Sequence, residues 1–161
     1  MLPEKIDAKN FDNYFKNLLN KKGGKNVITS RFDLEAVLLE EKLDFIIQLF
    51  FSKKTIDYLI YKILYWEDDS SIKRALNSLE ITDFEIDSSY NGDENPGVLF
   101  IELTSFDKFI FKSLLINHFN FEIAEEPSLN LRIQICLGIG ERIYLLDIYD
   151  DRGFDMYYLK I

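Results

Sequence analysis

The stretch LNLRIQICLGIGERIYLLDIYDDRGFDMYYLKI, residues 129–161, decides the expected fold. Three segments of it are rich in β-branched and aromatic side chains, which is typical of strands: 129–137, 142–149 and 154–161. The connections between them, Gly138–Glu141 and Asp150–Gly153, are only four residues long. Connections this short join antiparallel neighbours. The sequence therefore predicts a three-stranded meander over about residues 129–161.

Helix and strand patterns alternate upstream of the meander. Apolar residues at helical spacing predict an N-terminal helix over about residues 8–22, closed by the cations and glycines of Lys21–Lys25. Residues 27–34 and 56–66 have the composition of strands, and residues 38–50 return to helical spacing. The second of these strands is apolar for most of its length, so we expect it to be buried on both faces.

Two further helices are expected between the strands. Glu67–Ser71 offers N-cap residues for a short helix that runs through Leu79. After a loop at Asn91–Gly97 and a strand at residues 98–103, Ser105 is the predicted cap of a longer helix with Asp107 in its first turn. The expected apolar stripe of that helix is Phe106, Phe109, Ile110, Ser113, Leu114 and Phe121.

These patterns predict one domain, residues 1–161, of the α+β class. An antiparallel or mixed sheet is expected, with about four helices packed on it. The composition is 47% hydrophobic and 15% aromatic, which supplies a core of large side chains.

The charge balance restricts the class of partner. The net charge is −9, from 28 acidic and 19 basic residues. Such a surface repels nucleic acids and anionic membranes and attracts basic proteins. Residues 1–7 lack the features of a signal peptide, and no apolar run approaches the roughly 20 residues of a membrane span. We therefore expect a soluble, cytoplasmic protein that binds neither nucleic acid nor membrane.

The sequence offers no strong catalytic motif. Gly23–Lys25 is followed by Asn26, whereas a phosphate-binding loop needs Ser or Thr after its lysine. Cys136 lies in an alternating strand, where a thiol behaves as a small buried hydrophobe, and His118 closes a helix, where an imidazolium suits the helix dipole. We expect no catalytic residue, no metal ion and no cofactor.

Acidic residues gather in two places, Glu67-Asp68-Asp69 and the C-terminal set Asp147, Asp150, Asp151 and Asp155. Solvated turns are the simplest interpretation of both. The alternative is a small-molecule- or metal-binding domain or a hydrolase that uses the C-terminal acids, with Arg152 holding an anion.

Asp150-Asp151-Arg152-Gly153 also has the composition of a hairpin connection. Asp150 can bond its own backbone, and Gly153 is predicted to take the positive φ that such loops need near their end. Arg152 is placed to bridge to Asp150 or Asp155, a contact worth about 0–1 kcal/mol where it is exposed.

Tyr149-Asp150-Asp151-Arg152-Gly153 after an apolar strand resembles the closing signature of an uncharacterised bacterial family, number thirty-eight eighty-five among the domains of unknown function. Arg31-Phe32-Asp33-Leu34 is similar to its early strand and Phe111–Phe121 to the helix before its final strands. The resemblance covers the chain from about Asn26 onward, without an alignable motif between Trp66 and Gly97. It implies no reaction, because the family has none established; some members resemble immunity proteins encoded beside bacterial toxins.

The sequence thus favours a non-enzymatic binding protein, an immunity protein that neutralises a cognate basic toxin such as a nuclease. The residues predicted to bind the partner are Glu67, Asp68, Asp69, Asp150, Asp151, Arg152 and Asp155, with Gly153 as the structural residue of the turn.

Overall fold

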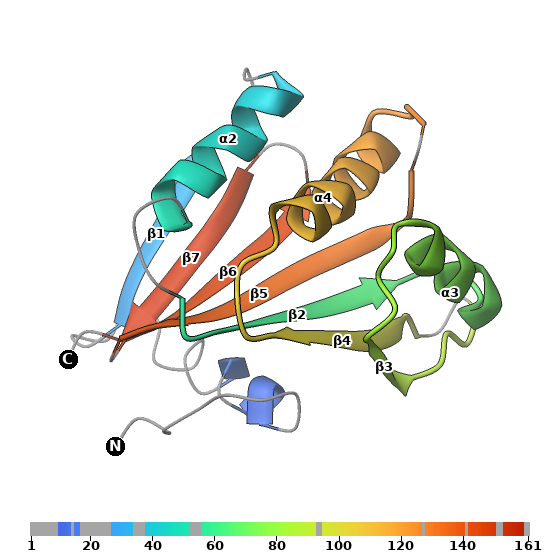
Figure 1. The fold of residues 1–161 in the computed structure, drawn as a ribbon, viewed down its shortest axis with the longest axis horizontal. Helices are drawn as coiled ribbons and strands as arrows, with labels where there is room; N and C mark the ends of the chain where they lie inside the picture. Colours follow the sequence, from blue (N-terminus) through green and yellow to red (C-terminus); the bar gives the residue numbers. More distant parts are fainter. Residues whose placement is uncertain are drawn as a thin grey trace.

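Within the described residues, seven strands form an antiparallel sheet in the order β1-β7-β6-β5-β2-β4-β3 (Figure 1). The computed structural model describes residues 10–13, 15–16, 27–33, 38–51, 56–92, 95–126, 128–140, 142–150 and 153–159. Its elements are β1 (Val27–Asp33), α2 (Leu39–Phe50), β2 (Tyr58–Tyr65), α3 (Asp69–Ser78), β3 (Glu85–Ser88), β4 (Gly97–Leu103), α4 (Lys108–Glu122), β5 (Leu131–Ile139), β6 (Arg142–Asp150) and β7 (Gly153–Leu159).

The C-terminal meander lies at the centre of the sheet. β5 pairs with β6 and β6 with β7, both antiparallel, as the short connections predicted. β1 extends this core by pairing with β7, and β2 extends it on the other side by pairing with β5. The α+β class and the three-stranded meander are therefore confirmed. Of the two sheet types that the sequence allowed, the described strands form the antiparallel one.

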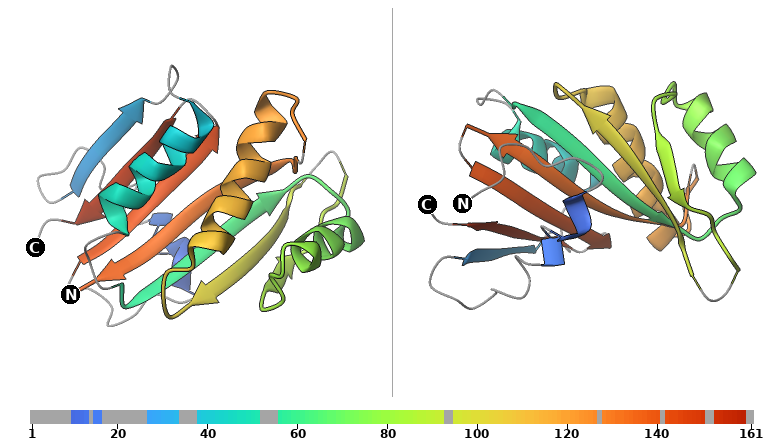
Figure 2. Two further views of the ribbon diagram at one scale, coloured as in Figure 1. Left: turned by 45° about the horizontal axis from the view of Figure 1, so that its top comes forward. Right: turned by 90° about the horizontal axis from the view of Figure 1, so that it is seen from below.

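Helices α2 and α4 cover one face of the sheet, which we call the first face (Figures 1 and 2). Alternate residues of β2, among them Leu59, Tyr61 and Ile63, lie in the main core cluster together with Ile46 of α2 and Leu114 of α4. Each of these five side chains is at most 1% exposed. The other residues of β2 face the opposite way, so this strand is buried on both sides, as its apolar run predicted.

The opposite, second face carries the N-terminal helical residues 10–13 and 15–16 (Figure 2). The Phe11 ring packs edge-on against Phe100 of β4 at 5.9 Å, and the Phe15 ring packs against Tyr157 of β7 at 6.2 Å. Phe11 and Phe15 thus pack on this face between β4 and β7, and both belong to a second, smaller core cluster. A helix was predicted over about residues 8–22; the rest of that range and the predicted stop at residues 21–25 lie outside the described residues.

Two predictions for α4 differ from the structure, one of them only in part. The N-cap is Asp107 and not Ser105, because the Asp107 carboxylate accepts the backbone N–H of Ile110 at 3.1 Å. Part of the predicted stripe is correct, since Leu114 is buried and Phe106 and Ile110 pack against the core. The rest is misplaced, because Phe109 is 55% and Phe121 42% exposed. The side chains that α4 buries are Phe111, Leu114, Leu115, Asn117, His118, Phe119 and Asn120. Apolar residues surround much of this helix, so spacing alone did not identify its buried side.

The edge strand β3 was not predicted. Its sequence, Glu85-Ile86-Asp87-Ser88, has a single β-branched residue between acids, a composition that suits an exposed edge rather than a core strand. None of the helices in the described part of the chain has the length and apolar character of a membrane span.

Candidate functional site

A row of polar side chains crosses the second face. The register places Asp155 of β7 between Arg31 of β1 and Asp147 of β6. From Asp147 the row continues through Gln134 of β5 to Lys62 of β2. Residues in register on neighbouring strands point to the same face, so these side chains from five strands lie side by side.

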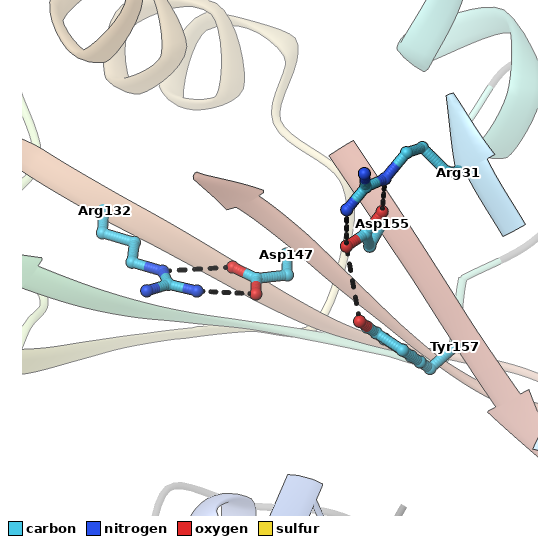
Figure 3. Close-up of polar contacts among 5 residues, drawn as sticks. All are labelled: Arg31, Arg132, Asp147, Asp155 and Tyr157. Atoms are coloured by element: carbon cyan, nitrogen blue, oxygen red, sulfur yellow. Dashed lines mark hydrogen bonds and ion pairs between the residues drawn. The ribbon is translucent and has the colours of Figure 1, made fainter. Parts of the chain in front are cut away.

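Arg31 binds Asp155 with two parallel hydrogen bonds (Figure 3). The Arg31 Nε donates to Oδ1 at 2.8 Å and a terminal nitrogen donates to Oδ2 at 3.2 Å. The hydroxyl of Tyr157 donates to the same Oδ2 at 3.4 Å. Asp155 is only 8% exposed, so its charge is almost removed from water and needs these donors.

Arg132 holds Asp147 in the same way (Figure 3). Its Nε donates to Oδ1 at 3.3 Å and its terminal nitrogen donates to Oδ2 at 2.8 Å, and this bonding raises the pKa of the Arg132 guanidinium. Asp147 and Asp155 stand directly opposite each other on β6 and β7. Like charges in that position repel, and one arginine for each carboxylate compensates the repulsion.

The two carboxylates also affect Tyr157, which lies beside them. Burial, followed by the negative charges of Asp155 and Asp147, raises the pKa of Tyr157 to about 12. The phenol therefore stays protonated at neutral pH and donates to Asp155. Because both oxygens of each carboxylate accept bonds from arginine, the arrangement favours a structural role over acid–base chemistry or metal binding by Asp147 and Asp155.

Cys136 and His118 are not brought together. Cys136 is fully buried in the cluster of the second face, and burial raises the pKa of its thiol. His118 is buried in α4, which packs on the first face. The sheet separates the two side chains. The expectation of a buried thiol is confirmed, whereas His118 lies inside the helix and not at its exposed end.

The run Glu67-Asp68-Asp69 binds other parts of the same chain. Glu67 accepts the backbone N–H of Asn130 at 3.1 Å and so links the start of α3 to the segment before β5. Asp69 accepts the Tyr65 hydroxyl at 2.7 Å and the backbone N–H of Tyr90 at 3.1 Å. These bonds are intramolecular and part-buried, which favours a structural role for both acids.

Asp68 occupies the N-cap of α3 and is exposed. It accepts the hydroxyls of Ser70 and Ser71, each within 2.9 Å, and these bonds lower the pKa of its carboxyl. Its side chain caps no backbone N–H. The cap was therefore predicted at the right place, but its hydrogen bonds go to neighbouring side chains.

At the hairpin between β6 and β7, Asp150 pairs with Gly153. Asp151, Arg152 and the side chain of Asp150 lie outside the described residues, so the predicted bridge from Arg152 is not placed. The prediction of a positive φ at Gly153 is wrong. A Cβ there would lie 2.2 Å from the carbonyl oxygen of Phe32, so glycine is required by the close approach of β1.

A pocket of about 290 Å³ opens elsewhere on the second face, where β2, β4 and the chain entering β3 meet. Its lining is Tyr58, Ile60, Asp83, Phe84, Glu85, Phe100, Glu102, Leu103 and Thr104. Tyr58, Ile60 and Phe100 are buried, whereas the three acids are exposed. The pocket therefore combines an apolar, aromatic floor with an acidic rim.

None of the pocket residues was among the predicted site residues. Asp83, Glu85 and Glu102 are separated in the sequence and form no acidic run. The strand pairing brings them together, because Glu85 stands opposite Phe100 and Glu102 follows two residues later on the same face. Aromatic residues that alternate with acids, as in Phe84-Glu85 and Phe100-Ile101-Glu102, are a signal that sequence reasoning could have used.

Comparison of the chain with family models, curated proteins and solved structures finds no match. The resemblance to the uncharacterised bacterial family stays a prediction. Within the described residues, no three Cys, His, Asp or Glu side chains lie together as a metal site would need.

Proposed function

We propose that the chain is a non-enzymatic binding protein, an immunity protein that neutralises a cognate basic toxin by direct contact. The observation that carries the proposal is the contrast between two sets of acids. Asp147 and Asp155 are each neutralised by an arginine. Asp83 and Glu85, on the rim of the pocket, are paired with no cation among the described residues.

The unpaired acids and the net charge of −9 suit a basic partner. Complementary charge raises the association rate and excludes partners of the wrong sign, while an apolar floor supplies the desolvated contact that affinity needs. A basic nuclease carries its positive charge where it binds the nucleic acid backbone. An acidic protein bound over that surface blocks the substrate, and this mechanism requires no chemistry from the immunity protein.

Co-expression tests the proposal. The product of the adjacent gene is induced with and without this chain, and growth is measured. A toxic neighbour that is rescued by the chain supports the proposal. The purified pair should then form a complex whose association rate falls as ionic strength rises, because the charges are screened. A neighbour that is not toxic, or whose toxicity the chain does not relieve, contradicts the proposal.

A further inference from the structure

We infer that the pocket on the second face binds a lysine or arginine side chain presented by a protein partner. The identity of that partner as a toxin rests on the proposed function. The size, the floor and the rim of the pocket each suit a cationic side chain.

The size of the pocket suits one long side chain. Sites for drug-sized ligands and cofactors enclose roughly 300–1,000 Å³, and this pocket, at about 290 Å³, lies at the lower end of that range, with room for a long side chain. Its walls come from the paired strands β2 and β4, from the first residue of β3, and from Asp83 and Phe84 before it. A side chain that enters between them meets a surface formed before binding, so little conformational entropy is lost on the receptor side.

The floor of the pocket is aromatic and held in place. The Tyr58 ring lies over Gly138 of β5, where a Cβ would approach it to 2.3 Å, so the glycine leaves room for the ring to lie on the strand. The Phe100 ring is held by the edge-on contact with Phe11. Aromatic faces attract ammonium and guanidinium groups, and the apolar stem of lysine or arginine packs well on them.

The rim of the pocket selects a cation. Asp83 and Glu85 are exposed, and neither is paired with a cation among the described residues. Glu102 lies on the same face of β4 as Phe100 and also lines the pocket. Among the described residues, the lining contains no lysine, arginine or histidine. An anionic or neutral ligand would therefore meet uncompensated negative charge, whereas a cation meets carboxylates and ring faces together.

Titration of the whole chain with a hexa-arginine peptide, followed by amide NMR shifts, tests the inference. We expect the largest shifts at residues 83–85 and 100–104. The variant Asp83→Asn/Glu85→Gln keeps the shape of both side chains and removes their charges. Because two exposed ion pairs are lost, we expect its affinity for the peptide to fall on the order of fivefold.

The matched control is Glu41→Gln/Glu125→Gln, which removes the same charge from two exposed acids outside the pocket. Its affinity should change less than twofold, a limit set by the weak, screened effect of distant charges. The dispersion of the amide spectrum shows that each variant is folded. The inference would be overturned by amide shifts that map away from the pocket, or by an equal loss of peptide affinity in the two variants. Either result would mean that the peptide is attracted only by the net charge of the chain.

The toxin assay separates this inference from the proposed function. If the pocket variant rescues growth as well as the unmodified chain, the pocket is not the contact site, although the immunity role stands. If the unmodified chain rescues no toxin but binds the peptide at the pocket with the expected selectivity, the immunity role fails and the cation site stands.

Discussion

Replacing Gly153 distinguishes two reasons why the β6–β7 connection needs glycine. The sequence suggested a positive φ, but the structure shows a close approach of β1. A Cβ at Gly153 would lie 2.2 Å from the carbonyl oxygen of Phe32, about 0.8 Å short of the 3.0 Å that real Cβ atoms keep. β1 must then move away, and the Arg31–Asp155 pair lies only two residues along the same two strands.

We expect Gly153→Ala to lower the free energy of unfolding by about 1–3 kcal/mol, the usual cost of forcing extra atoms into a packed place. For a chain of 161 residues this corresponds to a melting temperature lower by roughly 2–12 °C. Gly153→Asn should be at least as damaging, because its larger side chain meets the same carbonyl. Circular dichroism against temperature and urea measures both variants.

Gly140 is the matched control. It lies in the other connection of the meander with φ +60°, and a Cβ there meets nothing within 4 Å. Alanine should cost about 1–2 kcal/mol at this position, while asparagine, which tolerates left-handed backbone, should cost less. The order of the two substitutions is thus reversed between Gly140 and Gly153. A Gly153→Asn protein more stable than Gly153→Ala would refute the close-approach argument and restore the positive φ.

Three further predictions concern the Arg132–Asp147 pair, Asp69 and Cys136. A double-mutant cycle of Arg132→Gln and Asp147→Asn, measured by urea denaturation, should give a coupling free energy of about 1–3 kcal/mol, since charge-assisted bonds to a buried carboxylate are lost. Purely additive effects of the two substitutions would contradict the pairing. The hydroxyl of Tyr65 lowers the pKa of Asp69, so the stability that Asp69 adds is present above its ordinary value of 3.8 and is lost as the pH falls through the depressed pKa. The melting temperature of Asp69→Asn should therefore fall less between about pH 5 and pH 2.5 than that of the unmodified chain, and parallel curves would exclude the effect. Burial raises the pKa of the Cys136 thiol, so iodoacetamide should modify it, by mass spectrometry, only after unfolding; rapid alkylation of the native chain would contradict its placement.

The sequence predicted the elements whose pattern of residues lies within one short segment of the chain. Strand composition and short connections were sufficient for the meander, and an uninterrupted apolar run was sufficient for β2. The bounds of the connections were too wide, because four residues predicted to lie in them belong to the strands: Gly138, Ile139, Asp150 and Gly153. The order of the strands was not predictable in the same way. β1 pairs with β7, which lies at the other end of the sequence, and neither strand has a sequence feature that identifies the other as its partner. The sheet order therefore depends on packing between segments far apart in the sequence.

The polar row depends on the register for the same reason. Asp147 and Asp155 are visible in the sequence as acids within apolar strands. Their partners, Arg132 and Arg31, become identifiable only when the strands are aligned. A shift of one residue between β1 and β7 would turn Arg31 or Asp155 to the other face of the sheet, and a shift between β5 and β6 would do the same to Arg132 or Asp147.

The density of acids in a sequence is a poor guide to where unpaired negative charge lies. A run such as Glu67-Asp68-Asp69 stands where a strand ends and a helix begins, and there carboxylates are retained because they accept backbone and hydroxyl donors. Isolated acids such as Asp83 and Glu85 accept no such bonds from the residues that the structure describes. Protection of an exposed edge strand accounts for a charge on β3, but it does not require an aromatic floor beside that charge. The combination of the two is what a cationic partner needs, so we expect the partner to contact the β3–β4 side of the second face rather than the dense acids of the C-terminal hairpin.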